Sequence, residues 1–137
     1  MHFDRPKIAV VLRDDLLAWQ EINVASFLIS GVTAAHPELV GEPYADADDV
    51  RYLPVLGHPV LVLVASDEQL ATMRGRAVGR GMPISVYTAE MFSTSNDADN
   101  RAVVAAVGSD ALDLVGIGIA GERNAVDKVT KGGHLHR

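Results

Sequence analysis

Hydrophobic and polar residues follow one another in blocks that predict strands separated by helices. The first block, 7–12, contains a continuous apolar and largely β-branched run, which is typical of a strand covered on both faces. Charged residues at 13–15 end this strand, and apolar residues then recur at helical spacing from Trp19 to Val32. The helix is expected to end near Pro37. Its predicted apolar stripe is Ile22, Ala25, Ile29 and Val32, with Val24 and Leu28 beside it.

The rest of the chain repeats this order. The run PVLVLVA at 59–65 predicts a second buried strand, and Ser66 or Asp67 is placed to cap a following helix that ends before 79–83. We expect further strands at 84–87 and 114–119, and further helices at 96–107 and 122–128.

Two segments are expected to lie at the periphery. The polar stretch 41–49 is typical of a loop, and 50–56 predicts a short strand. We expect this strand at an edge of the sheet, because Pro54 cannot donate a hydrogen bond to a neighbouring strand. The tail 131–137 is also predicted to pair as an edge strand.

Strands that alternate with helices predict an α/β fold. We expect a three-layer sandwich whose central sheet is mixed, mostly parallel, and has four to five strands with helices on both faces. A chain of 137 residues is large enough for a core of its own, so 1–137 is predicted to form a single domain.

Charge and composition narrow the classes of function. The net charge of −6 argues against a general nucleic-acid binder, because phosphate binding favours a basic surface. The chain has no cysteine, which excludes disulfides and thiolate chemistry. We expect a cytoplasmic protein with no membrane partner, since the sequence shows no leader and no stretch long enough to span a bilayer.

Three acidic residues, Asp46, Asp48 and Asp49, look like the start of a calcium loop. That loop requires glycine at its sixth position and glutamate at its twelfth, where this chain has Arg51 and Gly57. The five histidines show no zinc spacing either. We therefore predict no metal and no cofactor.

The first strand and the following helix meet at a polar corner where α/β folds often place chemistry. Asp14 and Asp15 could bind a ligand, or form an ion pair and a helix cap. The next polar group could form a pocket wall, or simply the first turn of the helix, with the tryptophan packed inward. This group consists of Trp19, Gln20, Glu21 and Asn23.

A second candidate group follows the third strand. Thr94, Asn96 and Asn100 offer hydroxyl and amide groups at a helix N-terminus, which suits an anion, although Asp97 and Asp99 would oppose one. The alternative is that these residues only cap the helix.

The chain resembles the type-2 peptidyl-tRNA hydrolase superfamily over nearly its whole length. The resemblance rests on Asp15-Leu16 leading into a helix, on the strand–helix–strand stretch 59–87, and on the ending LVGIGIAGERNAVDKVTKGGHL at 114–135, which includes the Asp-Lys-Val-Thr segment 127–130. It implies the fold of these hydrolases.

The hydrolase motifs themselves are replaced. Where the hydrolases have a glycine- and lysine-rich turn, this chain has Trp-Gln-Glu-Ile at 19–22, and it has no lysine between Lys7 and Lys128. Where they have Asp-Ala-Gly-Arg-Thr, it has Thr-Ala-Glu-Met-Phe at 88–92. The cations that hold RNA and the groups that activate water are therefore missing.

The segments 19–31, 91–100 and 126–132 are more similar to an uncharacterised bacterial family of unknown function within that superfamily. This resemblance implies a fold and no activity. The main hypothesis is binding of a small molecule or a protein, and the alternative is a peptidyl-tRNA hydrolase or other hydrolase that uses substitute residues. The apolar first helix and the dimers of related folds predict a homodimer.

Overall fold

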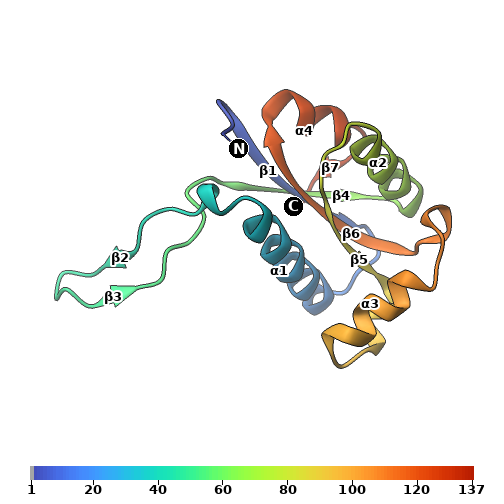
Figure 1. Ribbon diagram of the computed structural model, residues 1–137, viewed down its shortest axis with the longest axis horizontal. Coiled ribbons are helices and arrows are strands. Elements are labelled where there is room, and N and C mark those ends of the chain that lie inside the picture. The colour runs from blue at the N-terminus through green and yellow to red at the C-terminus, as the bar shows by residue number, and fades with distance from the viewer. Residues whose placement is uncertain (1) are drawn as a thin grey trace.

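The computed structural model describes residues 2–137 and contains a five-stranded sheet (Figure 1). Only β1 and β4 run parallel, whereas the β5–β6, β6–β1 and β4–β7 pairs are antiparallel. The predicted mixed sheet is confirmed, but the expectation that it is mostly parallel is wrong. In spatial order the strands are β5 (Ser85–Thr88), β6 (Leu114–Glu122), β1 (Pro6–Arg13), β4 (Val60–Ala65) and β7 (His134–Leu135).

The burial of the central strands on both faces explains why the prediction of their directions was wrong. Helix α1 (Ala18–Ala35) covers one face of the sheet, and α2 (Asp67–Gly79) and α4 (Arg123–Val129) cover the other (Figure 1). A central strand covered on both faces is apolar throughout, whether its neighbours are parallel or antiparallel. The sequence of β6 therefore carried no sign of its direction. Helix α3 (Asp97–Ala105) lies beyond the end of β5 (Figure 1).

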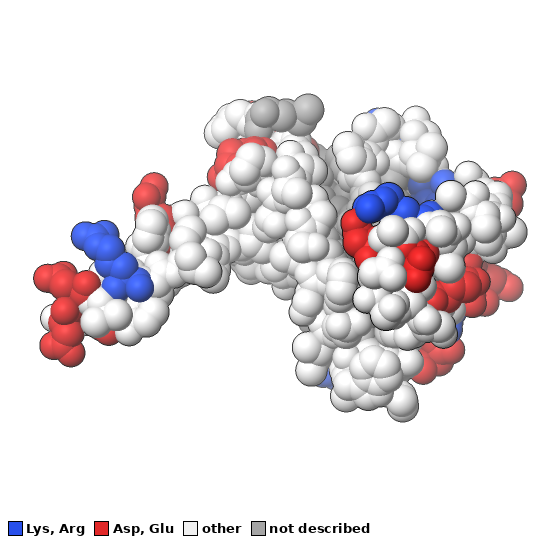
Figure 2. All heavy atoms as spheres, turned by 60° about the horizontal axis from the view of Figure 1, so that its bottom comes forward, with Lys and Arg blue, Asp and Glu red and all other residues white. Residues whose placement is uncertain are grey.

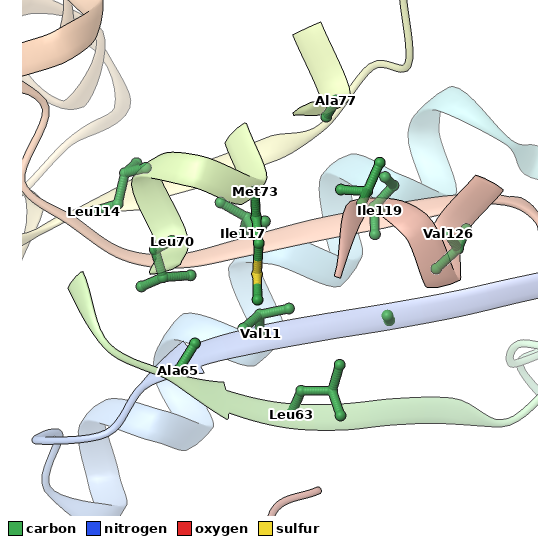
Figure 3. Close-up of a cluster of buried hydrophobic side chains, with 12 residues drawn as sticks. Val11, Leu63, Ala65, Leu70, Met73, Ala77, Leu114, Ile117, Ile119 and Val126 are labelled. Atoms are coloured by element: carbon green, nitrogen blue, oxygen red, sulfur yellow. The ribbon is translucent and has the colours of Figure 1, made fainter. Parts of the chain in front are cut away.

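The core lies on both faces of β1, whose side chains alternate between them. Val11 packs with Ile117 of β6 beneath α2, and Figure 3 shows Leu70 and Met73 extending from that helix onto this layer. Val10 on the other face packs beneath α1. The predicted apolar run at the start of the chain thus fills two core layers.

Helix α1 contacts the sheet through a stripe that overlaps the predicted one but is centred on neighbouring residues. Val24, Leu28 and Val32 are buried, whereas Ile22 is 70% exposed. The reason lies in β6, where Gly116 makes room for the helix, since a Cβ atom there would come within 2.8 Å of Val24 Cγ1. Within the predicted stripe Val32 is buried and Ala25 and Ile29 are half-buried against the core, so only Ile22 is wrongly placed, and Val24 and Leu28 beside the stripe are the more deeply buried residues.

Residues 41–57 form a two-stranded ribbon, hereafter the arm, that extends away from the sheet (Figure 1). Its strands β2 (Tyr44–Ala45) and β3 (Arg51–Tyr52) pair with each other. The short strand predicted within 50–56 is therefore present as β3, but it lies in this ribbon and not at the edge of the main sheet. The backbone N–H of Gly41 donates to the Val55 carbonyl at 2.8 Å, and this contact closes the base of the ribbon and directs it outward.

Several local predictions are confirmed. Ser66 caps α2 by accepting a hydrogen bond from the backbone N–H of Gln69 at 3.2 Å. Asn96 caps α3 in the same way, through the N–H of Asp99 at 2.8 Å. The tail pairs with β4 as β7. Three short 3-10 helices complete the structure: η1 (Pro37–Leu39), η2 (Ala89–Ser93) and η3 (Ser109–Ala111).

In the part of the chain that the structure describes, no helix has the length and apolar character needed to cross a membrane.

Candidate functional site

A pocket of about 310 Å³ lies between the N-terminal half of α1, the end of β5, and the segment from η2 into α3. Five of the nine residues predicted from the sequence meet in it, although they come from two distant parts of the chain. These five are Trp19, Asn23, Thr94, Asn96 and Asn100, and the other lining residues are Phe27, Tyr87, Met91, Phe92, Ser95 and Asp97.

One wall of the pocket consists of aromatic rings in contact with one another. The Trp19 and Phe92 rings meet edge to face with 5.9 Å between centroids, and Phe92 lies 5.1 Å from Tyr87. Phe27 extends the row, 5.7 Å from Tyr87. Trp19 and Phe27 are more than half exposed, whereas Tyr87 is buried. The wall is therefore rigid at its centre and open at its ends.

The Tyr87 hydroxyl is held from behind by α1. Asn23 Nδ2 donates to Tyr87 Oη at 3.2 Å, so the hydroxyl oxygen acts as an acceptor and its proton remains free for another partner. A phenol is protonated at neutral pH, and burial raises the pKa of Tyr87 further. This contact also explains an asparagine inside a helix, where it is intrinsically unfavourable.

The lining that comes from the start of α3 and the residues before it is polar. The Thr94 hydroxyl donates to the Met91 carbonyl at 3.0 Å and contacts the Asn100 side chain. Asn96 uses its amide on Asp99, since Nδ2 donates to Oδ2 at 2.9 Å in addition to the cap. Thr94 and Asn100 are half-buried, whereas Asn96 is exposed. Capping therefore accounts for Asn96, and the side chains of Thr94 and Asn100 remain the candidates for ligand contact.

The electrostatics of the pocket disfavour an anion. No lysine or arginine is among the described residues that line it, and Asp97 places a carboxylate at the start of α3. Asp97 forms an ion pair with Arg101, one turn further along the exposed side of α3. A neutral ligand suits this environment better than a phosphate or carboxylate.

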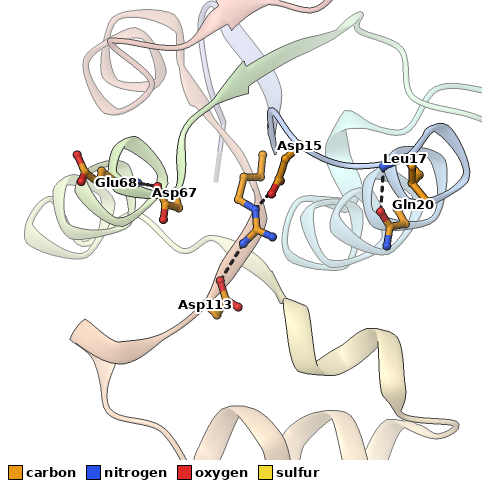
Figure 4. A network of polar contacts seen from close by, with 7 residues as sticks. Asp15, Leu17, Gln20, Asp67, Glu68 and Asp113 are labelled. Atoms are coloured by element: carbon orange, nitrogen blue, oxygen red, sulfur yellow. Dashed lines mark hydrogen bonds and ion pairs between the residues drawn. The ribbon is translucent and has the colours of Figure 1, made fainter.

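Three other predicted residues lie outside the pocket, after the end of β1 and at the start of α1, and Figure 4 shows two of them, Asp15 and Gln20. Asp15 accepts a hydrogen bond at 2.7 Å from Arg13, which also bonds to Asp113 at 2.8 Å. The hydrogen bond with Asp15 is the largest cause that raises the pKa of Arg13. Gln20 Oε1 accepts from the Leu17 backbone N–H at 2.9 Å and so serves the start of α1. Asp14 is exposed at the strand end, where its backbone N–H donates to Ala65.

Glu21, the remaining predicted residue, faces a second cavity of about 430 Å³ with otherwise mainly apolar walls. Glu21 Oε2 lies 2.5 Å from Nε2 of His136, which also lines the cavity. The imidazole Nδ1 lies 2.7 Å from the Arg137 carbonyl. Both partners are acceptors, so the ring satisfies both only when it is protonated. The hydrogen bond with Glu21 is the main cause that raises the pKa of His136.

The residues at these sites that were not predicted from the sequence include the aromatic residues Phe27, Tyr87 and Phe92, and His136. Aromatic residues are scarce, with one tryptophan, three tyrosines and three phenylalanines in the chain. Four of those seven line one pocket. Because aromatic residues are few in this chain, each of them could have been considered as a site candidate from the sequence. Their proximity to one another, however, arises only from the packing of α1 against η2.

Within residues 2–137, no three His, Asp or Glu side chains lie close enough to hold a metal ion. Asp46, from the discarded calcium pattern, instead orders the tip of the arm. Tyr52 Oη donates to Asp46 Oδ2 at 2.6 Å, and the backbone N–H of Asp48 donates to Oδ1 at 2.9 Å.

Comparison with known proteins places the chain in a family. The profile of the family described as "Protein of unknown function (DUF2000)" matches residues 6–137. The chain belongs to the DUF2000 family. The predicted membership in a family of unknown function is thus confirmed.

The chain is also similar to a solved structure, that of the protein of unknown function Atu0240 from Agrobacterium tumefaciens strain C58. The two are 42% identical, with a TM-score of 0.95, and the match covers 99% of this chain and 100% of the other. Among curated proteins, none matches the chain.

Proposed function

We propose that the pocket between α1 and α3 binds a small, uncharged molecule with a planar heterocyclic ring, of the chemical class of nucleobases and nucleosides. The contact that carries this proposal is the Asn23–Tyr87 hydrogen bond, which leaves the phenol proton of Tyr87 to be donated at the aromatic wall. A ring stacked on that wall would direct its edge along the wall, toward the polar side chains of the segment from η2 into α3 that complete the lining.

The composition of the two walls supports this class of ligand. Planar bases stack on aromatic side chains, and asparagine and threonine side chains bond to base edges. Phe92 provides ring surface, and Thr94 and Asn100 provide polar atoms in the same lining. The volume of about 310 Å³ lies at the lower end of the range for small-molecule sites.

The alternative is a peptidyl-tRNA hydrolase or another hydrolase that uses substitute residues. We retain a hydrolase-like scaffold as part of the proposal, because Asp127–Thr130 follow β6 in and just after α4, in the order that the sequence resemblance implies. The hydrolase chemistry does not follow from this scaffold. The pocket lacks a cation for the RNA backbone among its described lining residues.

The test is isothermal titration calorimetry with adenosine, guanosine, uridine and their 5′-monophosphates. We expect at least one nucleoside to bind, and its monophosphate to bind no more tightly, because no lysine or arginine is among the described lining residues. Absence of binding by all nucleosides at millimolar concentration would contradict the proposal. Tighter binding of a monophosphate would contradict the electrostatic argument.

A matched pair of variants tests whether the nucleoside binds in this pocket. Phe92→Leu removes ring area from the aromatic wall and should weaken nucleoside binding about tenfold, in keeping with one lost stacking contact. Phe3→Leu is the matched control, since Phe3 packs against His36 outside the pocket, and it should leave binding unchanged. A peptidyl-tRNA release assay tests the alternative, for which we expect no turnover.

A further inference from the structure

The outer face of α1 has the composition of a buried surface although it faces solvent. Glu21 is the only charged residue among the helix's 18, and it is paired with His136. Trp19, Ile22 and Phe27 are exposed by 60%, 70% and 51%. A surface helix ordinarily carries charged side chains on its outer face. This face therefore requires a different explanation from ordinary contact with water.

The hydroxyl groups on the same face do not depend on water. Ser26 Oγ donates to the Ile22 carbonyl at 2.8 Å, and Ser30 Oγ donates to the Phe27 carbonyl at 2.6 Å. Because both protons are used within the helix, covering the face would leave neither hydroxyl donor unpaired. Burial of this face against another protein surface would thus cost little polar desolvation.

The arm presents a second exposed apolar surface. An isolated two-stranded ribbon is only marginally stable in water. Its β-ladder is only two residues long on each strand, and it stands away from the sheet (Figure 1). Even so, five of its large side chains are more than half exposed, namely Tyr44, Val50, Tyr52, Leu53 and Val55.

We propose that the outer face of α1, together with the arm, is the interface of a homodimer. A two-fold interface places a surface patch against its own copy, so a charged patch repels itself. With a net charge of −6, most approaches between two copies are unfavourable. The uncharged face of α1 avoids this repulsion, and Figure 2 shows uncharged atoms over the surface between the arm and the charged groups of the main body. The arm is acidic, with Glu42, Asp46, Asp48 and Asp49 against Arg51, so in this dimer the arm of each copy lies on α1 of the other and not on the other arm.

The exposed apolar surface is of the size that a stable dimer needs. A large side chain that is at least half exposed offers on the order of 100 Å². The three on α1 and the five on the arm together offer about 800 Å², which matches the surface that each partner buries in a standard interface. Neither region reaches that area alone, so we assign both to one interface.

The dimer would also border the pocket. Trp19 and Phe27 belong both to the outer face of α1 and to the aromatic wall. A second copy packed on that face would cover the open ends of the wall. The dimer proposal stands independently of the identity of the pocket's ligand.

Sedimentation velocity on the full chain between 1 and 100 μM tests the proposal. We expect a species of twice the chain mass of 14.6 kDa. Ile22→Glu should raise the dimer dissociation constant at least 100-fold, because it places one carboxylate of each copy in the interface. Val78→Glu is the matched control, since Val78 is 60% exposed on α2 and the change should leave the dimer intact.

Leu53→Glu tests the arm separately, at a residue that is 84% exposed. It should weaken the dimer at least tenfold. Thermal unfolding of all three variants serves as a check that they fold, which exposed positions permit. A wild-type monomer at 100 μM, or an Ile22→Glu dimer as tight as the wild type, would overturn the proposal. An unchanged dimer in Leu53→Glu would overturn the part assigned to the arm.

Discussion

The side-chain amide of Asn23 donates a hydrogen bond to the Tyr87 hydroxyl at 3.2 Å and so joins α1 to β5 at the back of the pocket. The two residues lie 64 positions apart in the chain. The bond orients the phenol, because the oxygen accepts from Asn23 and the proton must be directed elsewhere. Structure and proposed recognition thus depend on the same contact.

Tyr87→Phe should weaken nucleoside binding about tenfold, which corresponds to about 1.4 kcal/mol, because it removes the donor offered to the ligand. Its ring contacts with Phe92 and Phe27 are retained. The free energy of unfolding should fall by about 1 kcal/mol, since the Asn23 amide loses its partner. Calorimetry and urea denaturation measure the two effects.

Asn23→Ala serves as the counterpart. It leaves the Tyr87 hydroxyl in place, so nucleoside binding should fall less than in Tyr87→Phe. The double variant should show non-additive losses of stability, because the two residues share one bond. Equal affinity of wild type and Tyr87→Phe for every nucleoside would contradict the donor role.

Substitution of glycine by alanine is expected to change stability in opposite directions at two positions, Gly118 and Gly75. A Cβ atom at Gly118 would lie 2.5 Å from Ser85 Oγ and 3.2 Å from the Leu28 carbonyl oxygen, at the contact between α1 and β6. Gly118→Ala should therefore lower the free energy of unfolding by about 1–3 kcal/mol through overpacking. Gly75 in α2 has no such neighbour within 4 Å, and Gly75→Ala should raise stability by up to about 1 kcal/mol.

Urea denaturation of both glycine variants measures these changes. A neutral Gly118→Ala would show that α1 can move away from β6 at little cost. Such a result would also mean that the orientation of α1 does not depend on the close approach of the helix to the glycines of β6.

Local structure was predictable from the sequence because its signals are local. Ser66 and Asn96 cap their helices, as their residue types indicate. Strand direction and the buried face of α1 depend on partners that are far away in the chain. Ile22 continues the helical spacing of apolar residues, yet it is exposed, because Gly116 admits Val24 and Leu28 instead. The spacing alone could not distinguish two neighbouring stripes.

The candidate site was predictable in part for a related reason. Polar residues that follow strands in an α/β fold gather at the same end of the sheet, which is how Asn23 and Thr94 come to share a pocket. Phe27 and Phe92 carry no such signal, since isolated aromatic residues usually indicate core. Whether Asp14, Asp15, Gln20 and Glu21 contact a ligand stays a prediction.

Arg13 and its two carboxylate partners allow the stabilising and binding roles of Asp15 to be separated. Arg13 bridges Asp15 and Asp113, and its side chain is 19% exposed. We expect Arg13→Gln to lower the free energy of unfolding by about 1 kcal/mol, with a smaller difference from the wild type at 1 M NaCl. Asp15→Asn should lower stability less and leave nucleoside affinity unchanged. A tenfold loss of affinity in Asp15→Asn would instead restore Asp15 as a ligand residue.

The Glu21–His136 pair predicts a pH-dependent attachment of the C-terminal tail to α1. The pKa of His136 is raised in the folded chain, chiefly by the hydrogen bond with Glu21. The attachment should therefore be complete below the unfolded histidine pKa of about 6.5, and be lost as pH rises through the higher folded value. NMR titration of the His136 ring should give a midpoint above that of the urea-unfolded chain, and Glu21→Gln should lower it. A midpoint that does not respond to Glu21→Gln would show that the pair does not hold the tail in solution.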